Sequence, residues 1–116
     1  MIGIDIVKIE RLADKINNTT FLNGVFTANE LDYYNSTGKR LETLAGFFAC
    51  KEAIAKALGT GFSGFKLTDI EITHTDKGAP IATLYGNAKK LSRGNQINIS
   101  ISHEERLATA VAIIKD

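Results

Sequence analysis

Three glycines and a lysine form the part of this sequence that is best suited to hold an anion. The loop GTGFSGF contains Gly59, Gly61 and Gly64, and glycines at this spacing allow backbone N–H groups to form a concavity for an anion. The loop follows a helical run whose C-terminal dipole disfavours negative charge, so Lys56 would have to supply the compensating charge. A dinucleotide fingerprint is excluded, because that motif leaves a strand and opens a helix. The simpler interpretation is a helix cap at Gly59 followed by a flexible turn.

Two carboxylates also stand out by their positions. Glu52 precedes Lys56 by four residues, which places both on one side of a helix; taken alone, such a pair is ordinarily a solvated ion pair worth about 0.3–0.5 kcal/mol. Asp5 interrupts MIGIDIV, an alternating segment typical of a strand with one isoleucine face. Aspartate is a poor strand residue and is costly to bury unpaired. The residues alone do not explain why Asp5 is there.

Lys51 lies in the middle of the apolar stripe of a helix predicted over 39–58. The stripe consists of Leu44, Phe47, Phe48, Ile54, Ala55 and Leu58. Two interpretations are open. Either the aliphatic stem of Lys51 lies on the core while its amine reaches water, or the amine lines a binding site for an anionic ligand beside the core.

The two histidines do not predict hydrolase chemistry. Ser102 and His103 are adjacent at the end of a predicted strand, so their side chains point to opposite faces. No nucleophile elbow surrounds them. His74 lies between threonines in a predicted turn, and we expect it at the surface rather than as a ligand.

The elements that must position these residues are mixed in order. Helices are predicted over 9–18, 27–38, 39–58 and 86–92, and strands over 1–7, 66–72, 81–85, 96–102 and 107–114. Thr27 and Glu30 form a capping box that opens the second helix. Clustered helices followed by mostly antiparallel strands predict an α+β fold.

Composition restricts the class of protein. The chain has 116 residues, and we expect one domain over 1–116. Its net charge of +1 is spread evenly, which argues against a nucleic-acid partner and against a membrane surface. A single cysteine, Cys50, leaves no disulfide within the chain. Because no apolar leader is recognisable, we expect a cytoplasmic protein.

Three motifs together resemble the holo-acyl-carrier-protein synthase family, small 4′-phosphopantetheinyl transferases of bacterial lipid synthesis. They are GIDIVKIERL near the start, FFACKEAIAKALGTG in the middle and SISHEERLATAVA near the end. The resemblance covers the whole chain. It implies the transferase fold and a reaction that moves the phosphopantetheine arm of coenzyme A to a serine of an apo acyl carrier protein, for fatty acid synthesis.

The resemblance also implies roles for individual residues. Asp5 and Glu52 would hold a divalent metal, normally Mg²⁺, which prefers one or two carboxylates completed by water and phosphate oxygens. Glu52 and Lys56 would be the catalytic residues. The residues expected around coenzyme A are Lys51, Lys56, Gly59, Gly61, Pro80 and His103. A homotrimer with active sites shared between neighbouring subunits is implied as well.

An acidic carrier protein requires a basic docking surface. Arg11 matches the docking arginine of the family, Lys15 lies one turn further on, and Lys39 and Arg40 are further candidates. The chain departs from the family at Phe47, where many relatives carry a basic residue suited to a phosphate contact. Lys51 or a neighbouring subunit would have to replace it.

Two other functions stay open. A transferase for polyketide or peptide carriers would share the chemistry, but those enzymes are about twice as long. A binding module that keeps the fold without catalysis would be expected to lack at least one of Asp5, Glu52 and Lys56, and all three are present.

Overall fold

Two antiparallel sheets and one long helix make up most of the computed structural model, which describes residues 1–61 and 63–115. The larger sheet contains β1 (Ile2–Lys8), β5 (Leu107–Ile114) and β4 (Ile97–His103), in the order β1-β5-β4. β2 (Ile70–His74) and β3 (Pro80–Leu84) form a separate hairpin. The predicted α+β class is confirmed.

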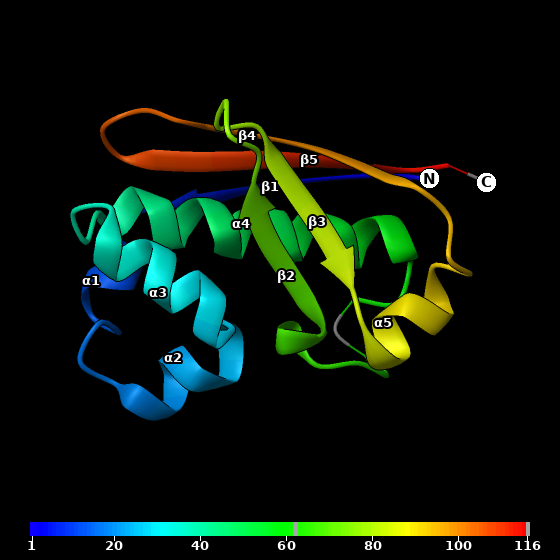
Figure 1. The fold of residues 1–116 in the computed structure, drawn as a ribbon, viewed down its shortest axis with the longest axis horizontal. Coiled ribbons are helices and arrows are strands. Elements are labelled where there is room, and N and C mark those ends of the chain that lie inside the picture. Colours follow the sequence, from blue (N-terminus) through cyan, green and yellow to red (C-terminus); the bar gives the residue numbers. More distant parts are fainter. Residues whose placement is uncertain (62, 116) are drawn as a thin grey trace.

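The long helix α4 (Leu41–Leu58) lies along one face of the larger sheet (Figure 1). Its alanine-rich sequence favours a helix. The small side chains also allow the helix to lie close to the sheet. Ala108, Ala110 and Ala112 of β5 are almost completely buried against it, which allows a close approach. Gly59 ends the helix in the left-handed conformation, with φ of 78°, as its predicted cap role requires.

The contact between β1 and α4 leaves no room for a side chain at Gly3. A Cβ there would lie 2.7 Å from the backbone nitrogen of Ala57 and closer still to the backbone oxygen of Ala53. We predict that Gly3→Ala lowers the free energy of unfolding by about 1–3 kcal/mol, because backbone atoms cannot move aside cheaply.

A matched control is available in the same chain. Gly24 lies in helix α2 (Thr19–Val25) with nothing near its would-be Cβ, so Gly24→Ala should stabilise the protein by about 0.5–1 kcal/mol. Urea unfolding of both variants measures the difference. Equal effects of the two substitutions would contradict the packing described for β1.

The predicted helix over 9–18 is wrong in its length. The structure has a short α1 (Glu10–Ala13) and then α2, which was not predicted. Asn18 separates them, because its side chain accepts a hydrogen bond from the backbone N–H of Phe21 and so caps a new helix. α3 (Ala28–Ser36) follows, opened by the predicted capping box of Thr27 and Glu30.

Most later elements agree with the prediction, apart from the segment 66–72. There, a 3₁₀ turn η1 (Leu67–Asp69) precedes β2, since the Asp69 carboxylate accepts a hydrogen bond from the backbone N–H of Lys66 and closes the turn. α5 (Gly86–Leu91) follows the hairpin. Among the described residues, no helix is both long and apolar enough to cross a membrane.

The isoleucine face of β1 points away from α4. Ile2, Ile4 and Ile6 have exposed fractions of 69%, 64% and 61%, while Gly3 and Val7 on the other face are buried. Ile113 of the neighbouring strand is also exposed. The outer face of the sheet therefore carries an apolar patch formed by these four isoleucines.

Candidate active site

Asp5 is paired with a lysine of the long helix. The Nζ of Lys56 donates to the Asp5 Oδ1 at 3.1 Å and to the backbone oxygen of Ile4 at 3.0 Å. Asp5 lies on the face of β1 that packs on α4, with its side chain largely buried, whereas the side chain of Lys56 is about half exposed. Lys56 thus makes its ion pair with Asp5 and not with Glu52, four residues before it.

Glu52 lies close enough to Asp5 for the two carboxylates to interact. Partial burial raises the pKa of Glu52, and the negative charge of Asp5 raises it further, while the positive charges of Lys56 and Arg11 act in the opposite direction. Two carboxylates that repel each other beside a lysine suit a divalent cation with oxygen ligands. Among the described residues, no cluster of three or more metal-binding side chains exists.

The raised pKa of Glu52 predicts an effect on stability. Its pKa is higher in the folded than in the unfolded protein, so the stabilisation from its protonated form is present at low pH and is lost as the pH rises through the folded-state pKa. In metal-free protein, Glu52→Gln should therefore have a higher melting temperature than wild type at pH 7, and the difference should shrink toward pH 4.

Glu42 provides the control for this experiment. It lies in the first turn of α4, where a negative charge interacts favourably with the helix dipole, so Glu42→Gln should not stabilise the protein at pH 7. Thermal melts in a chelator at both pH values make the comparison. A Glu52→Gln variant less stable than wild type at pH 7 would show that the two carboxylates do not repel each other.

The glycine loop begins directly after Lys56 and the last turn of α4. Gly59 and Gly61 have φ values of 78° and 58°, a conformation that favours glycine, and nothing lies within 4 Å of a would-be Cβ at either residue. Their backbone is therefore accessible at the end of the helix that carries Glu52 and Lys56. Phe62 of the same loop lies outside the described residues.

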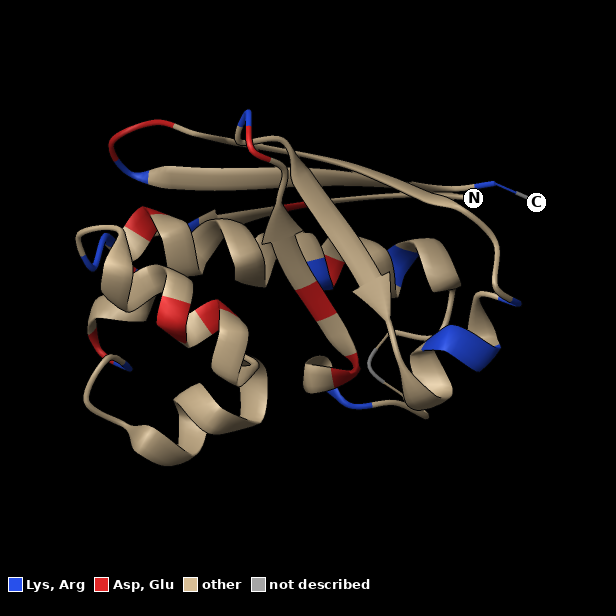
Figure 2. Cartoon of the chain, viewed as in Figure 1, with Lys and Arg blue, Asp and Glu red and all other residues tan. Residues whose placement is uncertain are grey.

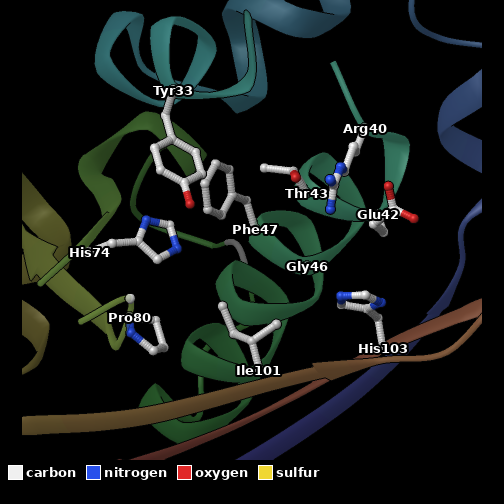
Figure 3. A pocket seen from close by; sticks show the side chains of 11 residues that line it. Tyr33, Arg40, Glu42, Thr43, Gly46, Phe47, His74, Pro80, Ile101 and His103 are labelled. Carbon is white, nitrogen blue, oxygen red and sulfur yellow. The ribbon is translucent and has the colours of Figure 1, made fainter. Parts of the chain in front are cut away.

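A pocket of about 310 Å³ lies on the other side of α4 (Figure 3). Arg40, Pro80 and His103, all singled out in the sequence, line it together with several aromatic residues. The pocket is bounded by α3, the start of α4, the end of the β2–β3 hairpin and the end of β4. It combines a polar side, with Arg40, Glu42 and His103, and a mainly aromatic and apolar side.

The predicted site residues thus fall into two groups within one chain. We call Asp5, Glu52 and Lys56 the carboxylate group, and Arg40, Pro80 and His103 the pocket group. Phe47, beside the pocket, and Glu52 project from α4 about 140° apart. In the sheet, Asp5 is on β1 and His103 on β4, which are opposite edges separated by β5.

Lys51 belongs to neither group, and both interpretations of it were wrong. Its side chain is fully buried, and its Nζ donates to the Glu30 Oε1 at 2.7 Å and to three backbone oxygens. Burial lowers its pKa, and Glu30 opposes that shift. The amine reaches neither water nor a ligand, because helix α3, α2 and the start of β2 enclose it.

His74 was also misplaced by the sequence analysis. It ends β2 instead of lying in a surface turn, and its ring stacks on Tyr33 with centroids 4.3 Å apart. Both residues line the pocket. Tyr33 was not singled out at all, since it lies 41 residues from His74 in the sequence and nothing local signals the contact.

The predicted docking residues lie in different places. The positive charge of Arg11 acts on Glu52, so this arginine is near the carboxylate group. The amine of Lys15 lies 5.7 Å from the centroid of the Phe21 ring, and Arg40 lines the pocket. Figure 2 shows that α5, which carries Lys89 and Lys90, is also basic and lies at the opposite end of the molecule from α1.

Comparison with known proteins decides the family. The model of the family described as "ACPS: 4'-phosphopantetheinyl transferase superfamily" matches residues 1–112. The chain belongs to the 4′-phosphopantetheinyl transferase superfamily. The resemblance seen in the three sequence motifs is therefore confirmed.

Curated and solved members of the superfamily resemble the whole chain. A holo-[acyl-carrier-protein] synthase of Thermoanaerobacter sp. (strain X514) is 46% identical over 116 residues, covering 97% of this chain and 84% of the relative. The synthase of Helicobacter pylori, solved in complex with coenzyme A, is 34% identical with a TM-score of 0.87, covering 99% of this chain and 100% of that one. The synthase of Bacillus anthracis, solved with "CoA (3',5'-ADP)", is 34% identical with a TM-score of 0.82, covering 97% and 93%.

Proposed function

We propose that this superfamily member is a holo-acyl-carrier-protein synthase, an enzyme that transfers the 4′-phosphopantetheine arm of coenzyme A to a serine of an apo acyl carrier protein. The observation that carries the proposal is the carboxylate group, in which Asp5 and Glu52 are close enough to interact and Lys56 pairs with Asp5. All three belong to motifs of the family. A module that only bound a nucleotide would have no need for two repelling carboxylates.

The reaction is a phosphoryl transfer. The serine oxygen forms a bond to the phosphorus that bears the pantetheine arm, and the bond from that phosphorus to the bridging oxygen of the pyrophosphate breaks. The products are holo carrier and adenosine 3′,5′-bisphosphate. The proton of the serine leaves to a base, and the negative charge of the leaving phosphate has to be neutralised.

Different residues of the chain have different roles in this reaction. Asp5 and Glu52 would hold Mg²⁺, which supplies positive charge to the phosphate oxygens when bound. Glu52 accepts the proton of the serine, directly or through a water molecule. Lys56 releases Asp5 and stabilises the leaving phosphate, and the accessible backbone of Gly59 and Gly61 binds coenzyme A beside it.

The pocket group can join this site only from a second chain. It binds the nucleotide end of coenzyme A, but within one chain α4 and β5 separate it from the carboxylate group. A homotrimer in which the carboxylate group of one subunit meets the pocket group of the next resolves this separation. The exposed isoleucine patch supports the proposal, because its burial between subunits would remove a large apolar surface from water. The cytoplasmic location stays a prediction.

A mass measurement tests the function directly. Purified protein is incubated with coenzyme A, Mg²⁺ and apo acyl carrier protein, and the mass of the carrier is followed. The expected result is a gain of one phosphopantetheine arm that a chelator prevents. A carrier that never gains mass, although the protein binds coenzyme A, would favour the binding module instead. Apo carrier domains of polyketide and peptide synthesis, tested in parallel, measure carrier selectivity.

Arg11 provides a prediction about carrier docking. An acidic carrier is attracted by basic residues near the site, so Arg11→Ala should raise KM for the carrier about tenfold while KM for coenzyme A changes little. Lys89→Ala on α5 removes the same charge at the far end of the molecule and should leave both values unchanged. Steady-state kinetics at low salt measures the four values. Equal losses for both substrates would show that Arg11 does not act through the carrier.

A further inference from the structure

The hairpin of β2 and β3 carries part of the pocket, although it does not belong to the larger sheet. His74 ends β2 and is paired with Pro80, the first residue of β3, and both line the pocket. Figure 3 shows their side chains on one side of the pocket, across from that of His103. The position of this pocket wall therefore depends on what holds β2 against the helices.

One edge of β2 is bound by side chains instead of by a strand. β2 pairs with β3 along its other edge. On the free edge, the backbone N–H of Ile72 donates to the Glu30 Oε2 at 2.7 Å, and the Lys51 Nζ donates to the backbone oxygen of Ile70 at 2.8 Å. Without these partners, two buried backbone groups would be unsatisfied, which costs free energy.

The same two side chains also join the helices to one another. The Nζ of Lys51 donates to the Glu30 Oε1 and, at 2.6 Å, to the backbone oxygen of Val25, the last residue of α2. Next to this pair, the hydroxyl of Thr27 donates to the Glu71 Oε2 at 2.6 Å and so connects the start of α3 to β2. We call Glu30, Lys51, Thr27 and Glu71 the polar layer. Because hydrogen bonds are directional and apolar contacts are not, the polar layer fixes where β2 lies along α3 and α4.

Three aromatic rings beside the pocket come from the same elements as the polar layer. Tyr33 lies one turn after Glu30 on α3, and Phe47 lies one turn before Lys51 on α4. The ring of His74, at the end of β2, stacks on Tyr33 with centroids 4.3 Å apart and lies 5.8 Å from that of Phe47. A movement of β2 relative to either helix would therefore change these ring contacts and displace the pocket wall.

We propose that the polar layer positions the pocket for coenzyme A, with Glu30 and Lys51 as its main positioning residues. It holds β2 in the place that brings His74 and Pro80 to the pocket wall. Glu30 and Lys51 act through the hairpin and touch no ligand, because both side chains are fully buried. This inference rests on the proposed function, in which the pocket binds the nucleotide end of coenzyme A. Since that end is separate from the reacting phosphorus, a displaced wall weakens the binding of coenzyme A and leaves the chemical step unchanged.

A double variant separates positioning from the cost of an unpaired buried charge. Glu30→Leu/Lys51→Met removes both charges together, so neither is left without its partner, and it also removes the bonds to β2. KM for coenzyme A should rise about tenfold, while kcat and KM for the carrier should stay within about twofold of wild type. Steady-state kinetics is measured at a temperature at which thermal melts show folded protein. An unchanged KM for coenzyme A in the folded double variant overturns the proposal.

Ile114→Ala is the control for lost stability alone. Ile114 is fully buried in β5 and does not line the pocket, and its truncation leaves a cavity in the core. This variant should have a lower melting temperature than wild type and the same KM for coenzyme A. An equal rise of KM in Ile114→Ala and in the double variant would overturn the proposal, because any loss of stability would then have the same effect.

NMR measures the position of His74 without any substrate. The chain has two histidines, so His103→Gln assigns the Hε1 resonance of His74. The stacked ring of Tyr33 affects the chemical shift of this resonance. At pH 8, the folded double variant should have a different His74 shift from wild type, and folded Ile114→Ala should have the same one. An unchanged shift in the double variant overturns the positioning role, whereas a wild-type protein that modifies no carrier contradicts the proposed function.

Thr27→Val decides the question if the double variant does not fold. It keeps the buried pair but removes the hydrogen bond from the half-buried Thr27 to Glu71, with little change in side-chain shape. KM for coenzyme A should rise about two- to threefold, and the His74 resonance should also move. If neither KM nor the resonance differs from wild type, the proposal is overturned.

Discussion

Asp5→Asn and Glu52→Gln should each lower the rate of carrier modification by about 10²–10³, the largest effect on activity expected for this protein. Each substitution removes one of the two negative charges that would hold Mg²⁺, while the size and shape of the side chain stay almost the same. Asp5→Asn also frees Lys56 from its ion pair. The initial rate of mass gain by the carrier measures both losses.

Asp32→Asn is the control for charge alone. Asp32 is exposed on α3, away from the carboxylate group, and its substitution should leave the rate unchanged. Raising the Mg²⁺ concentration should recover part of the lost activity, since each variant retains one carboxylate. If activity survives both substitutions, the proposed reaction still holds, but Asp5 and Glu52 are not the residues that hold the metal.

The largest effect on stability is expected at Lys51. Lys51→Met should lower the free energy of unfolding by about 3–5 kcal/mol, because it leaves Glu30 as a buried charge without its partner. The same substitution at Lys56, five residues along α4, removes the half-exposed partner of Asp5 and should cost only about 1 kcal/mol. Urea unfolding at pH 7 compares the two variants. Equal small losses would mean that Glu30 becomes neutral without cost.

Local signals in the sequence predicted much of the fold. The capping box at Thr27, the stop at Gly59 and the alternation in β4 each act over a few residues, and the structure contains all three. Alternation in β1 was recognised too, but it identifies two faces without indicating which one is buried. Helix α2 was missed because the cap at Asn18 lies within a stretch whose apolar spacing suggested one continuous helix.

Only those site residues that belong to the family motifs could be predicted from the sequence. The family motifs identify Asp5 and Glu52, which come from segments far apart in the sequence. Neither the ion pair of Lys51 with Glu30 nor the stacking of His74 on Tyr33 is a property of local spacing. Each depends on how α3 packs against α4 and β2. For this reason the amine of Lys51, which lies in an apolar stripe, was predicted to reach solvent or a ligand and not a buried glutamate.

The carboxylate group and the pocket group lie on opposite sides of α4, and mixing two inactive variants shows whether they meet between subunits. Asp5→Asn disables the carboxylate group, and the double variant Arg40→Ala/His103→Ala disables the pocket group. The two are unfolded together in equal amounts and refolded. Every trimer that contains both variants has one site in three with an intact carboxylate group and an intact pocket group from the neighbour. Random mixing puts both variants in about three quarters of the trimers, so about a quarter of wild-type activity should return. No return of activity from refolded mixed trimers would place both groups of each active site within a single chain.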